Sequence, residues 1–421
     1  MIALSDVTRK CGRFVASAAQ ACWNRMPRQK RRWLLSGIVE RVANRTADAD
    51  LPSIFFPPDI RWYTTRFQRD HQMARALSEL GCPVFFNEPT PHFSVPGLLS
   101  AKSKESCEDI TQSLHLIRCP RFVYGDVIEL VQPDVVIMVW PRHGALVPSG
   151  NNTFVVYDMC DDHALAGRRA NDEFVRTHQK WIAAADVMVV TADRLLEAVR
   201  PQRPDAILLP NAVRPEDWEL AGPPPIPKDL RRARQAPVVV GYYGAIGRWF
   251  NWDMWESAAK ARPDWAFVLI GHHYDVQGAR HLERAKVLPN VHFLGGKPYE
   301  QLKNYLWHFD VATIPFVLNA ITQACSPVKL FEYMAAGKPI VTTRMQEVMK
   351  YKSVILADDN PDFVKKLEMA LLLRDDGVYR STLRAEAQAN TWRSRAKALF
   401  EAIGAAREQG GGVPRRMTKS D

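Results

Sequence analysis

The sequence predicts an α/β protein built from two doubly wound domains in tandem. Its 421 residues are enough for two or three domains, each with a sizeable core. Short apolar runs without polar alternation recur along the chain and are separated by helical patterns, which favours parallel sheets covered on both faces. A proline-rich stretch at 222–227 and a basic run at 231–234 interrupt this alternation. We therefore expect two domains facing each other across a cleft that is lined by the carboxyl ends of both sheets.

The first domain is expected over residues 51–215. Ile54–Phe56 and Pro83–Phe86 predict its first two strands, on either side of a helix at 66–80. Residues 90–113 lack periodicity and are expected to form a loop or an insertion. Further strands are predicted at 134–140, 154–158, 187–191 and 206–209, and further helices at 122–131 and 171–184.

Residues 216–236 are expected to be the interdomain linker and residues 237–385 the second domain. A C-terminal helix over 386–404 and a disordered basic tail over 405–421 are expected to follow. The strands of the second domain are predicted at 238–243, 266–270, 291–294, 311–316, 339–343 and 354–357, and its helices near 252–261, 299–308, 328–336 and 361–373.

Composition places the chain among soluble globular proteins, with 47% hydrophobic and 24% charged residues. The net charge of +10 divides into +6 over residues 1–50, +2 over residues 405–421 and only +2 over the body between them. A nucleic-acid binder would spread basic residues over the fold, so no nucleic-acid partner is expected. The seven scattered cysteines form no C-x-x-C, which argues against a zinc ribbon or a disulfide framework and favours a cytoplasmic setting.

The basic N-terminal segment, residues 1–50, allows two interpretations. Within it, five apolar residues fall on one helical stripe with basic residues around them: Leu34, Leu35, Ile38, Val39 and Val42. Such a helix could lie on an anionic lipid surface, which would make the chain peripheral at the inner face of the plasma membrane. It could equally pack on the body with a solvated basic face, and amphipathicity alone does not separate the two.

The sharpest feature is the segment 325–341, CSPVKLFEYMAAGKPIV. Ser326 suits the N-cap of a helix and Pro327 its first position. The free N–H groups at the start of a helix, with Lys329 in the first turn, suit a phosphate. Glu332 lies on the same face and can accept hydrogen bonds from sugar hydroxyls. The segment therefore fits a diphosphate with its ribose, and the structural alternative is a capped core helix with an i, i+3 ion pair.

Together with other runs in the same order, this segment resembles the GT-B-fold, nucleotide-sugar-dependent glycosyltransferases of group 1, the bacterial polysaccharide-biosynthesis type. The resemblance covers roughly residues 55–400 and implies an α/β, GT-B fold of two Rossmann-like domains facing each other across a cleft. The first domain would bind the acceptor and the second the donor. The other matching runs are QRDHQ at 68–72, LPNAV at 209–213, VVGYYGAIGRWF at 239–250, NVHFLG at 290–295 and FDVATIPF at 309–316.

The resemblance also implies roles for individual residues. Lys329 would neutralise the donor diphosphate with Arg248 as its cationic partner, and Glu332 would bind the ribose. The phosphates would be held by Ser326, Pro327 and the backbone that follows. A close backbone approach to the ligand explains Gly244. No cofactor and no metal ion are implied, and the nucleotide-diphosphate sugar is the donor substrate. The predicted donor-binding residues are Gly244, Arg248, Ser326, Pro327, Lys329 and Glu332.

One position departs from the family pattern. Many relatives carry a glutamate eight residues before the position of Glu332, where this chain has Ala324. The carboxylate that contacts the transferred sugar is therefore absent or supplied by another residue. The stereochemical outcome, retaining or inverting, stays open.

An inverting transferase also needs a base that takes the proton of the acceptor hydroxyl. Candidates follow a predicted strand of the first domain at the cleft. The alternative is that Asp161 or Asp162 caps the next turn. Asp59 and His71 are weaker candidates. The predicted catalytic residues are Asp158, Asp161, Asp162 and His163.

The sequence thus predicts a metal-independent, hexosyltransferase-like enzyme of bacterial surface or exopolysaccharide biosynthesis. Its partners would be a nucleotide sugar, a glycan or lipid-linked glycan with an acceptor hydroxyl, and an anionic membrane surface contacted through residues 1–50. A sugar-nucleotide epimerase on the same fold is an alternative. A second alternative is a non-catalytic, membrane-associated scaffold that binds nucleotide.

Overall fold

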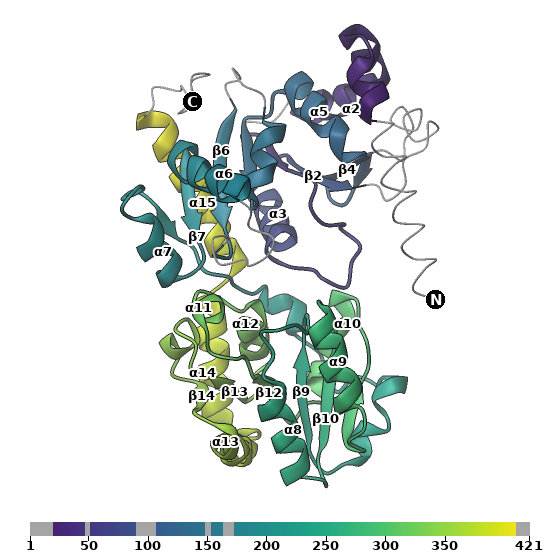
Figure 1. Cartoon of the computed structure of the whole chain (residues 1–421), viewed down its shortest axis with the longest axis vertical. Helices are drawn as coiled ribbons and strands as arrows, with labels where there is room; N and C mark the ends of the chain where they lie inside the picture. Colours follow the sequence, from purple (N-terminus) through teal and green to yellow (C-terminus); the bar gives the residue numbers. More distant parts are fainter. Residues whose placement is uncertain (1–19, 47–50, 90–106, 148–152, 163–171, 410–421) are drawn as a thin grey trace.

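The chain folds into two sheets of mainly parallel strands, one above the other, with helices on both faces of each (Figure 1). The computed structural model describes residues 20–46, 51–89, 107–147, 153–162 and 172–409. The first sheet has the strand order β3-β4-β2-β1-β5-β6-β7-β8, and the second has the order β11-β10-β9-β12-β13-β14. Of the strand pairs in the described ranges, β3 with β4 is the one antiparallel pair. The predicted α/β class with two doubly wound domains is confirmed.

The first domain places its strands and helices in alternation. Its strands are β1 (Ile54–Phe56), β2 (Val84–Pro89), β3 (Cys107–Asp109), β4 (Leu114–Cys119), β5 (Val135–Met138), β6 (Phe154–Met159), β7 (Val187–Val190) and β8 (Ile207–Leu208). Its helices are α2 (Arg28–Thr46), α3 (Arg69–Glu79), α5 (Tyr124–Val131), α6 (Asp172–Ala184) and α7 (Asp193–Val199).

The second domain repeats the pattern after the linker. Its strands are β9 (Val239–Tyr243), β10 (Ala266–Ile270), β11 (Val291–Phe293), β12 (Val311–Ile314), β13 (Ile340–Thr343) and β14 (Val354–Ala357). Its helices are α8 (Trp252–Ala261), α9 (Val276–Ala285), α10 (Tyr299–Trp307), α11 (Ala320–Gln323), α12 (Val328–Ala335), α13 (Asn360–Leu373) and α14 (Gly377–Gln388), and α15 (Trp392–Gln409) ends the described chain.

All of the predicted strands are present. Several other elements differ from the prediction, among them the C-terminal helix expected over 386–404, which is divided between α14 and α15 and continues to Gln409. Residues 90–113 are predicted to be a loop or an insertion, and strand β3 lies within this range. Strand β4 escaped prediction because His115 and Arg118 interrupt its apolar run, although His115 is buried. Helix α9 escaped prediction because few of its residues are apolar; it begins at Asp275, whose carboxylate accepts a hydrogen bond from the backbone N–H of Gly278 at 2.6 Å.

Each sheet has a point at which its strand order reverses, and the two points face each other. Strand β1 lies between β2 and β5, and β9 lies between β10 and β12. Segments that follow strand ends meet across the boundary: Thr65 Oγ1 lies 3.0 Å from His272 Nε2, and Asn211 Nδ2 donates to the carbonyl of Ser326 at 2.6 Å. In open α/β sheets ligands bind beyond the carboxyl ends of the strands at such a reversal. The fold therefore directs both ligand-binding edges into the space between the domains.

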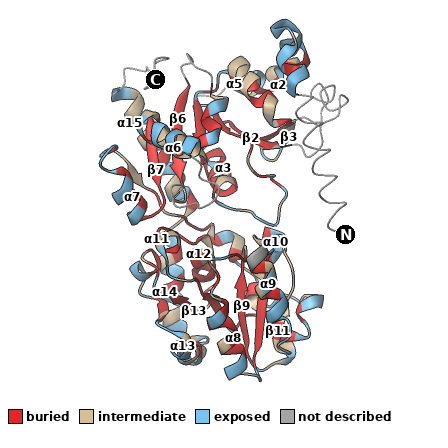
Figure 2. Ribbon diagram, viewed as in Figure 1, coloured by how far each residue is buried: buried red, intermediate tan, exposed pale blue. Residues whose placement is uncertain are grey.

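The central strands of both sheets are buried on both sides, as their uninterrupted apolar runs predict (Figure 2). The C-terminal helix α15 belongs to the core of the first domain although it follows the second. Its buried side chains pack in the same cluster as β1 and α3: Trp392, Ala396, Leu399 and Ile403. The chain therefore crosses between the domains a second time and ties them together.

Helix α2 resolves the two interpretations of the N-terminal stripe. Leu34, Leu35, Ile38 and Val42 are at most 6% exposed and pack with residues of α5, β1 and β2. The apolar stripe is therefore part of the protein core and does not face a lipid surface. No helix in the described ranges is long and apolar enough to cross a membrane.

Several basic residues of α2 are also neutralised by the body. Arg31 donates to Asp126 at 2.6 Å, and the indole Nε1 of Trp23, just before α2, donates to the same carboxylate at 2.7 Å. Arg28 pairs with Glu129, and Arg45 pairs with Asp109. These contacts fix the helix to α5 and to the edge of the sheet.

The packing of α2 predicts different effects for two apolar residues that are neighbours along the helix. Leu35 is fully buried, so Leu35→Ala should lower the free energy of unfolding by about 2–5 kcal/mol. Trp33 is 57% exposed, so Trp33→Ala should change it by less than about 0.5 kcal/mol. Chemical denaturation of both variants measures the difference. Equal effects would mean that α2 does not belong to the cooperative core.

Candidate functional site

The segment predicted to bind the donor forms helix α12, whose N-cap is Pro327. The prediction that Ser326 caps this helix was wrong by one residue. The Ser326 hydroxyl instead accepts a hydrogen bond from the backbone N–H of Asn211 at 3.2 Å, which holds the helix start against the interdomain segment. No side chain within the described ranges caps α12. The N–H groups of its first turn therefore remain available to an anion.

Lys329 lies half-buried in the first turn of α12, among aromatic rings. Its Nζ is 5.3 Å from the ring centroid of Tyr242 and 5.1 Å from that of Phe316. Burial lowers the pKa of this ammonium group. In the part of the chain that the structure describes, it has no hydrogen-bond or ion-pair partner, so the ion pair with Glu332 that the structural alternative requires is not formed. A desolvated cation without a counter-ion is suited to an anionic ligand.

Gly244 brings the backbone close to this lysine. Its φ of +134° disfavours any L side chain, and an added Cβ would lie 2.8 Å from Cε of Lys329. The Gly244 N–H donates to the carbonyl of Ile270 at 2.9 Å, so the turn is fixed to the neighbouring strand. Glycine is required here because a larger residue would displace the lysine.

Glu332 lies one turn further along α12 and is 5% exposed. Tyr243 donates a hydrogen bond to its Oε2 at 2.7 Å. Burial raises the pKa of Glu332 to about 7, against the opposing effects of this hydrogen bond and of the charge of Lys329. One carboxylate oxygen is thus held by the protein, and the other can serve a ligand hydroxyl.

Arg248 lies on the turn that follows β9, with its side chain exposed. Its backbone N–H donates to Asp275 at 3.1 Å, and Trp249 Nε1 donates to the carbonyl of Ala245 at 3.1 Å. The turn is therefore held in place. Among the described residues the guanidinium group has no hydrogen-bond or ion-pair partner, so it can reach a ligand.

Ala324, at the position where the resemblance implies a glutamate, is 1% exposed. It packs in an apolar cluster of the first domain with Tyr157 and Leu195. A longer, charged side chain would not fit into this cluster. After burial, the charge of Asp161 is the largest cause that raises the pKa of the adjacent Cys325. A carboxylate of the first domain therefore lies close to the position that lacks one.

Two of the predicted base candidates differ sharply in their surroundings. Asp158 is 2% exposed and accepts a hydrogen bond from Arg69 Nε at 2.7 Å. The carboxylate is thus held in a buried ion pair, which occupies it in a structural contact. Asp161 is exposed, and desolvation of its carboxyl group, followed by the charge of Asp162, raises its pKa. The remaining candidate, His163, lies outside the described residues.

The weaker candidates are engaged in structural contacts. Asp59 accepts a hydrogen bond from Trp140 Nε1 at 3.1 Å and pairs with Arg142. His71 is buried, which lowers its pKa to about 4, so it stays neutral. No group of three or more His, Cys, Asp and Glu side chains in the described ranges is arranged to hold a metal ion.

Asp70 is an acid that sequence reasoning did not single out. It lies half-buried in the first turn of α3, and burial, followed by the charges of Asp59 and Asp158, raises its pKa to about 7. The run QRDHQ pointed to this helix start only as a resemblance. Their spacing in the sequence does not indicate that the carboxyl groups of Asp59, Asp70 and Asp158 approach one another.

The pKa of Glu332 predicts how stability changes with pH. The folded chain holds the carboxyl proton more tightly than the ordinary pKa of 4.5 allows, so the associated stability is present in acid and is lost as pH rises through about 7. Relative to Glu332→Gln, which removes the titration, the unchanged protein should lose up to about 3 kcal/mol between pH 4 and pH 8.

Urea denaturation of both proteins across this range measures the difference. The contribution of Asp70 is common to both and cancels. A constant difference across the range would mean that Glu332 is ionised in the folded state throughout.

Comparison with known proteins agrees with this geometry. Residues 239–372 match the model of the family described as glycosyl transferases group 1. The putative teichuronic acid biosynthesis glycosyltransferase TuaH of Bacillus subtilis (strain 168) is 31% identical over 162 residues. That match covers 37% of this chain and 40% of TuaH, so this chain matches less than half of its curated relative.

Two solved structures have the same fold across most of the chain. HepE of Anabaena, solved in complex with UDP and glucose, superposes with a TM-score of 0.59 at 12% identity, over 84% of this chain and 100% of HepE. WaaG, a glycosyltransferase involved in lipopolysaccharide biosynthesis, superposes with a TM-score of 0.58 at 15% identity, over 83% of this chain and 99% of WaaG. Residues 239–372 therefore resemble the group 1 glycosyl transferases in sequence, and the chain as a whole has the two-domain GT-B fold of these structures.

Proposed function

We propose that this chain is a glycosyltransferase that moves a sugar from a nucleotide-diphosphate sugar to a hydroxyl group of a glycan or lipid-linked glycan. The observation that carries the proposal is the uncompensated cation of Lys329 at the uncapped start of α12, beside the turn at Gly244. Cleavage of the donor builds negative charge on the departing diphosphate. Positive groups placed there in advance stabilise that charge.

The other donor contacts follow from the same site. Arg248 has an exposed guanidinium that can share the diphosphate with Lys329. Glu332 retains one carboxylate oxygen for the ribose hydroxyls, since Tyr243 binds the other. HepE was solved with UDP and glucose and with UDP-glucose, which supports a uridine diphosphate sugar as the first donor to test.

For the acceptor hydroxyl we propose Asp161 as the base, with Asp162 next to it as the alternative. The support is the proximity of Asp161 to Cys325 on the donor side, its exposure to solvent and its raised pKa. A carboxylate with a raised pKa is a stronger base than an ordinary carboxylate. The names of TuaH and WaaG support bacterial surface polysaccharide assembly as the setting.

Lys329→Ala should abolish the slow release of nucleoside diphosphate from the donor. Loss of one group that stabilises the leaving diphosphate should lower this rate by about a hundredfold or more. The measurement is nucleoside diphosphate released from UDP-sugars, without and with acceptor glycans. Lys365→Ala, an exposed lysine on α13, is the matched control and should leave the rate unchanged.

The same assay separates the alternatives. Asp161→Asn should lower transfer to acceptor and leave nucleotide binding intact, whereas unchanged transfer would exclude Asp161 as base. Release of nucleoside diphosphate with interconversion of donor sugars, and with no acceptor product, would indicate a sugar-nucleotide epimerase. A donor that stays intact under all conditions would indicate a non-catalytic scaffold that binds nucleotide. If no nucleotide or nucleotide sugar raises the melting temperature, the donor site itself is refuted.

We also propose that the chain works as a cytoplasmic protein at the periphery of an anionic membrane, in contact through the exposed face of α2. The support is the position of Trp33, which is 57% exposed, next to the exposed Lys30 and Arg32. An aromatic ring beside cations suits the interface of a bilayer with anionic lipids. Because the stripe around Leu35 is buried, this contact would be electrostatic and shallow.

Binding to phosphatidylglycerol vesicles tests this contact. The triple variant Lys30→Gln/Arg32→Gln/Trp33→Ala should bind about tenfold more weakly, and phosphatidylcholine vesicles should bind neither protein. Arg194→Gln/Arg200→Gln removes the same two charges from an exposed part of α7 and its C-terminal end and should have no effect. Equal binding by all three proteins would exclude α2 as the contact.

A further inference from the structure

The loop between β1 and α3 forms a pocket of about 330 Å³. It lies at the carboxyl end of β1, where the order of the first sheet reverses between β2 and β5. In doubly wound sheets this is where ligands bind. The pocket is lined by Asp59, Ile60, Arg61, Tyr63, Thr64 and Arg66.

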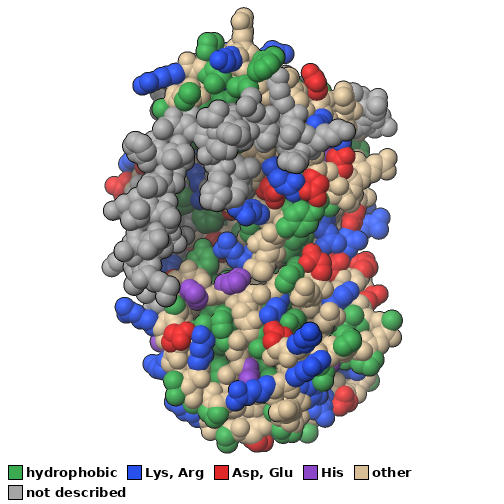
Figure 3. Space-filling model, turned by 90° about the vertical axis from the view of Figure 1, so that its right-hand side faces the viewer, with side chains coloured by type: hydrophobic (Ala, Val, Ile, Leu, Met, Phe, Trp, Pro, Cys, Tyr) green, Lys and Arg blue, Asp and Glu red, His purple; other side chains and the backbone are tan. Residues whose placement is uncertain are grey.

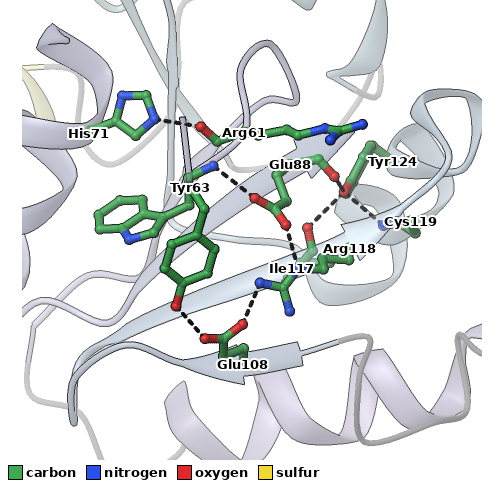
Figure 4. A network of polar contacts seen from close by, with 10 residues as sticks. Arg61, Tyr63, His71, Glu88, Glu108, Ile117, Arg118, Cys119 and Tyr124 are labelled. Carbon is green, nitrogen blue, oxygen red and sulfur yellow. Dashed lines mark hydrogen bonds and ion pairs between the residues drawn. The ribbon is translucent and has the colours of Figure 1, made fainter. Parts of the chain in front are cut away.

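The backbone of this loop is held in place by buried polar groups (Figure 4). Gln68 donates its backbone N–H to His71 Nδ1 at 3.3 Å, so the opposite ring nitrogen carries the proton and donates to the carbonyl of Arg61 at 2.9 Å. Glu88 accepts a hydrogen bond from the backbone N–H of Trp62 at 2.8 Å. Burial keeps His71 neutral, so this arrangement persists at neutral pH.

The edge of the sheet fixes the loop a second time. Tyr63 donates to Glu108 at 2.5 Å, and Arg118 pairs with both Glu88 and Glu108 (Figure 4). These acids are therefore neutralised within the protein. Since two independent sets of contacts hold the loop, its outward-facing side chains are presented from a fixed backbone, which lowers the cost of ordering a ligand.

The charges that remain at the pocket are positive. Arg142 neutralises Asp59, whereas Arg61 and Arg66 are exposed and have no hydrogen-bond or ion-pair partner for their guanidinium groups in the described ranges. The other acid nearby is Asp70, whose pKa of about 7 leaves it partly protonated at neutral pH. Two guanidinium groups without counter-ions favour an anion.

The pocket lies on the acceptor side of the boundary between the domains. The loop residue Thr65 contacts His272, which follows β10 of the donor domain, at 3.0 Å. Histidine and basic side chains gather along this boundary, where the surface is hollowed (Figure 3). An anion bound here would therefore face the donor domain without occupying the position of Lys329.

We propose that this pocket binds an anionic group of the acceptor, a phosphate or a carboxylate, through Arg61 and Arg66. The role of the anion as part of the acceptor rests on the proposed glycosyltransferase function, whereas the binding site itself does not. A planar guanidinium group binds either anion through two parallel hydrogen bonds. The acceptor would thus be an acidic or phosphorylated glycan rather than a neutral one.

Calorimetric titration with three probes tests the proposal: glucose 1-phosphate, glucuronate and neutral glucose. Both anions, or one of them, should bind more tightly than glucose, and the difference between them identifies the source of the charge. Arg61→Gln/Arg66→Gln should weaken anion binding by about tenfold or more. Because both side chains are exposed, the melting temperature should not change.

Two controls make the result specific. Arg194→Gln/Arg200→Gln removes the same charge from another exposed part of this domain and should bind the anions normally. Lys329→Ala disables the donor site and should also bind them normally. Anion binding that survives Arg61→Gln/Arg66→Gln, or that is no tighter than glucose binding, overturns the proposal. Failure of UDP to bind would refute the donor site alone and leave this result intact.

Discussion

The buried ion pair between Arg69 and Asp158 is the interaction on which the arrangement of the two domains depends. Both side chains are at most 4% exposed, and Arg69 also donates to Asn211 Oδ1 at 3.2 Å. Asn211 in turn binds Ser326 at the start of α12, and Arg69 lies 5.7 Å from the ring centroid of Trp392 on α15. One arginine thus connects helix α3 of the first domain, the interdomain segment, helix α12 and the returning C-terminal helix α15. Removing either member of the pair would leave a buried charge without compensation.

The contrast between paired and unpaired charges marks the surfaces that can bind ligands. The acids of the first domain are largely neutralised by arginines, as Asp158 is by Arg69 and Asp59 is by Arg142. Cations that lack such partners in the described ranges are present at both reversals of strand order: Lys329 in the second domain, and Arg61 with Arg66 in the first domain. The paired ions stabilise the fold, whereas these three unpaired cations are available to bind an anionic ligand.

Desolvation at the proposed donor site destabilises the charged side chains there and also makes them better able to bind a ligand. Burial raises the pKa of Glu332 and lowers that of Lys329, so both side chains are less stable in their charged forms than in water. A bound nucleotide sugar would compensate both groups, with phosphate oxygens at the lysine and hydroxyl groups at the glutamate. Burial of these groups therefore lowers the stability of the protein without ligand, and it strengthens their electrostatic interaction with a ligand.

The sequence alone determined the fold class, most of the strands and the donor segment. These features are local: uninterrupted apolar runs predict buried parallel strands, and the order of residues from Ser326 to Glu332 marks a helix start that suits phosphate. The N-cap was displaced by one residue because Ser326 bonds to Asn211 instead. The same amphipathic pattern fitted a lipid surface or a protein core at Leu35, and packing against α5 decided for the core.

Only the tertiary structure decided which charges are compensated. Asp158 and Asp161 are close in sequence and looked equivalent as bases, but Arg69, 89 residues away from Asp158, engages one of them and not the other. The pocket around Arg61 and Arg66 likewise depends on Glu88 and on the reversal of strand order at β1. The electrostatic state of a side chain is set by its neighbours in space. In a parallel sheet those neighbours come from separate strands, so their identity follows from the fold and not from local sequence.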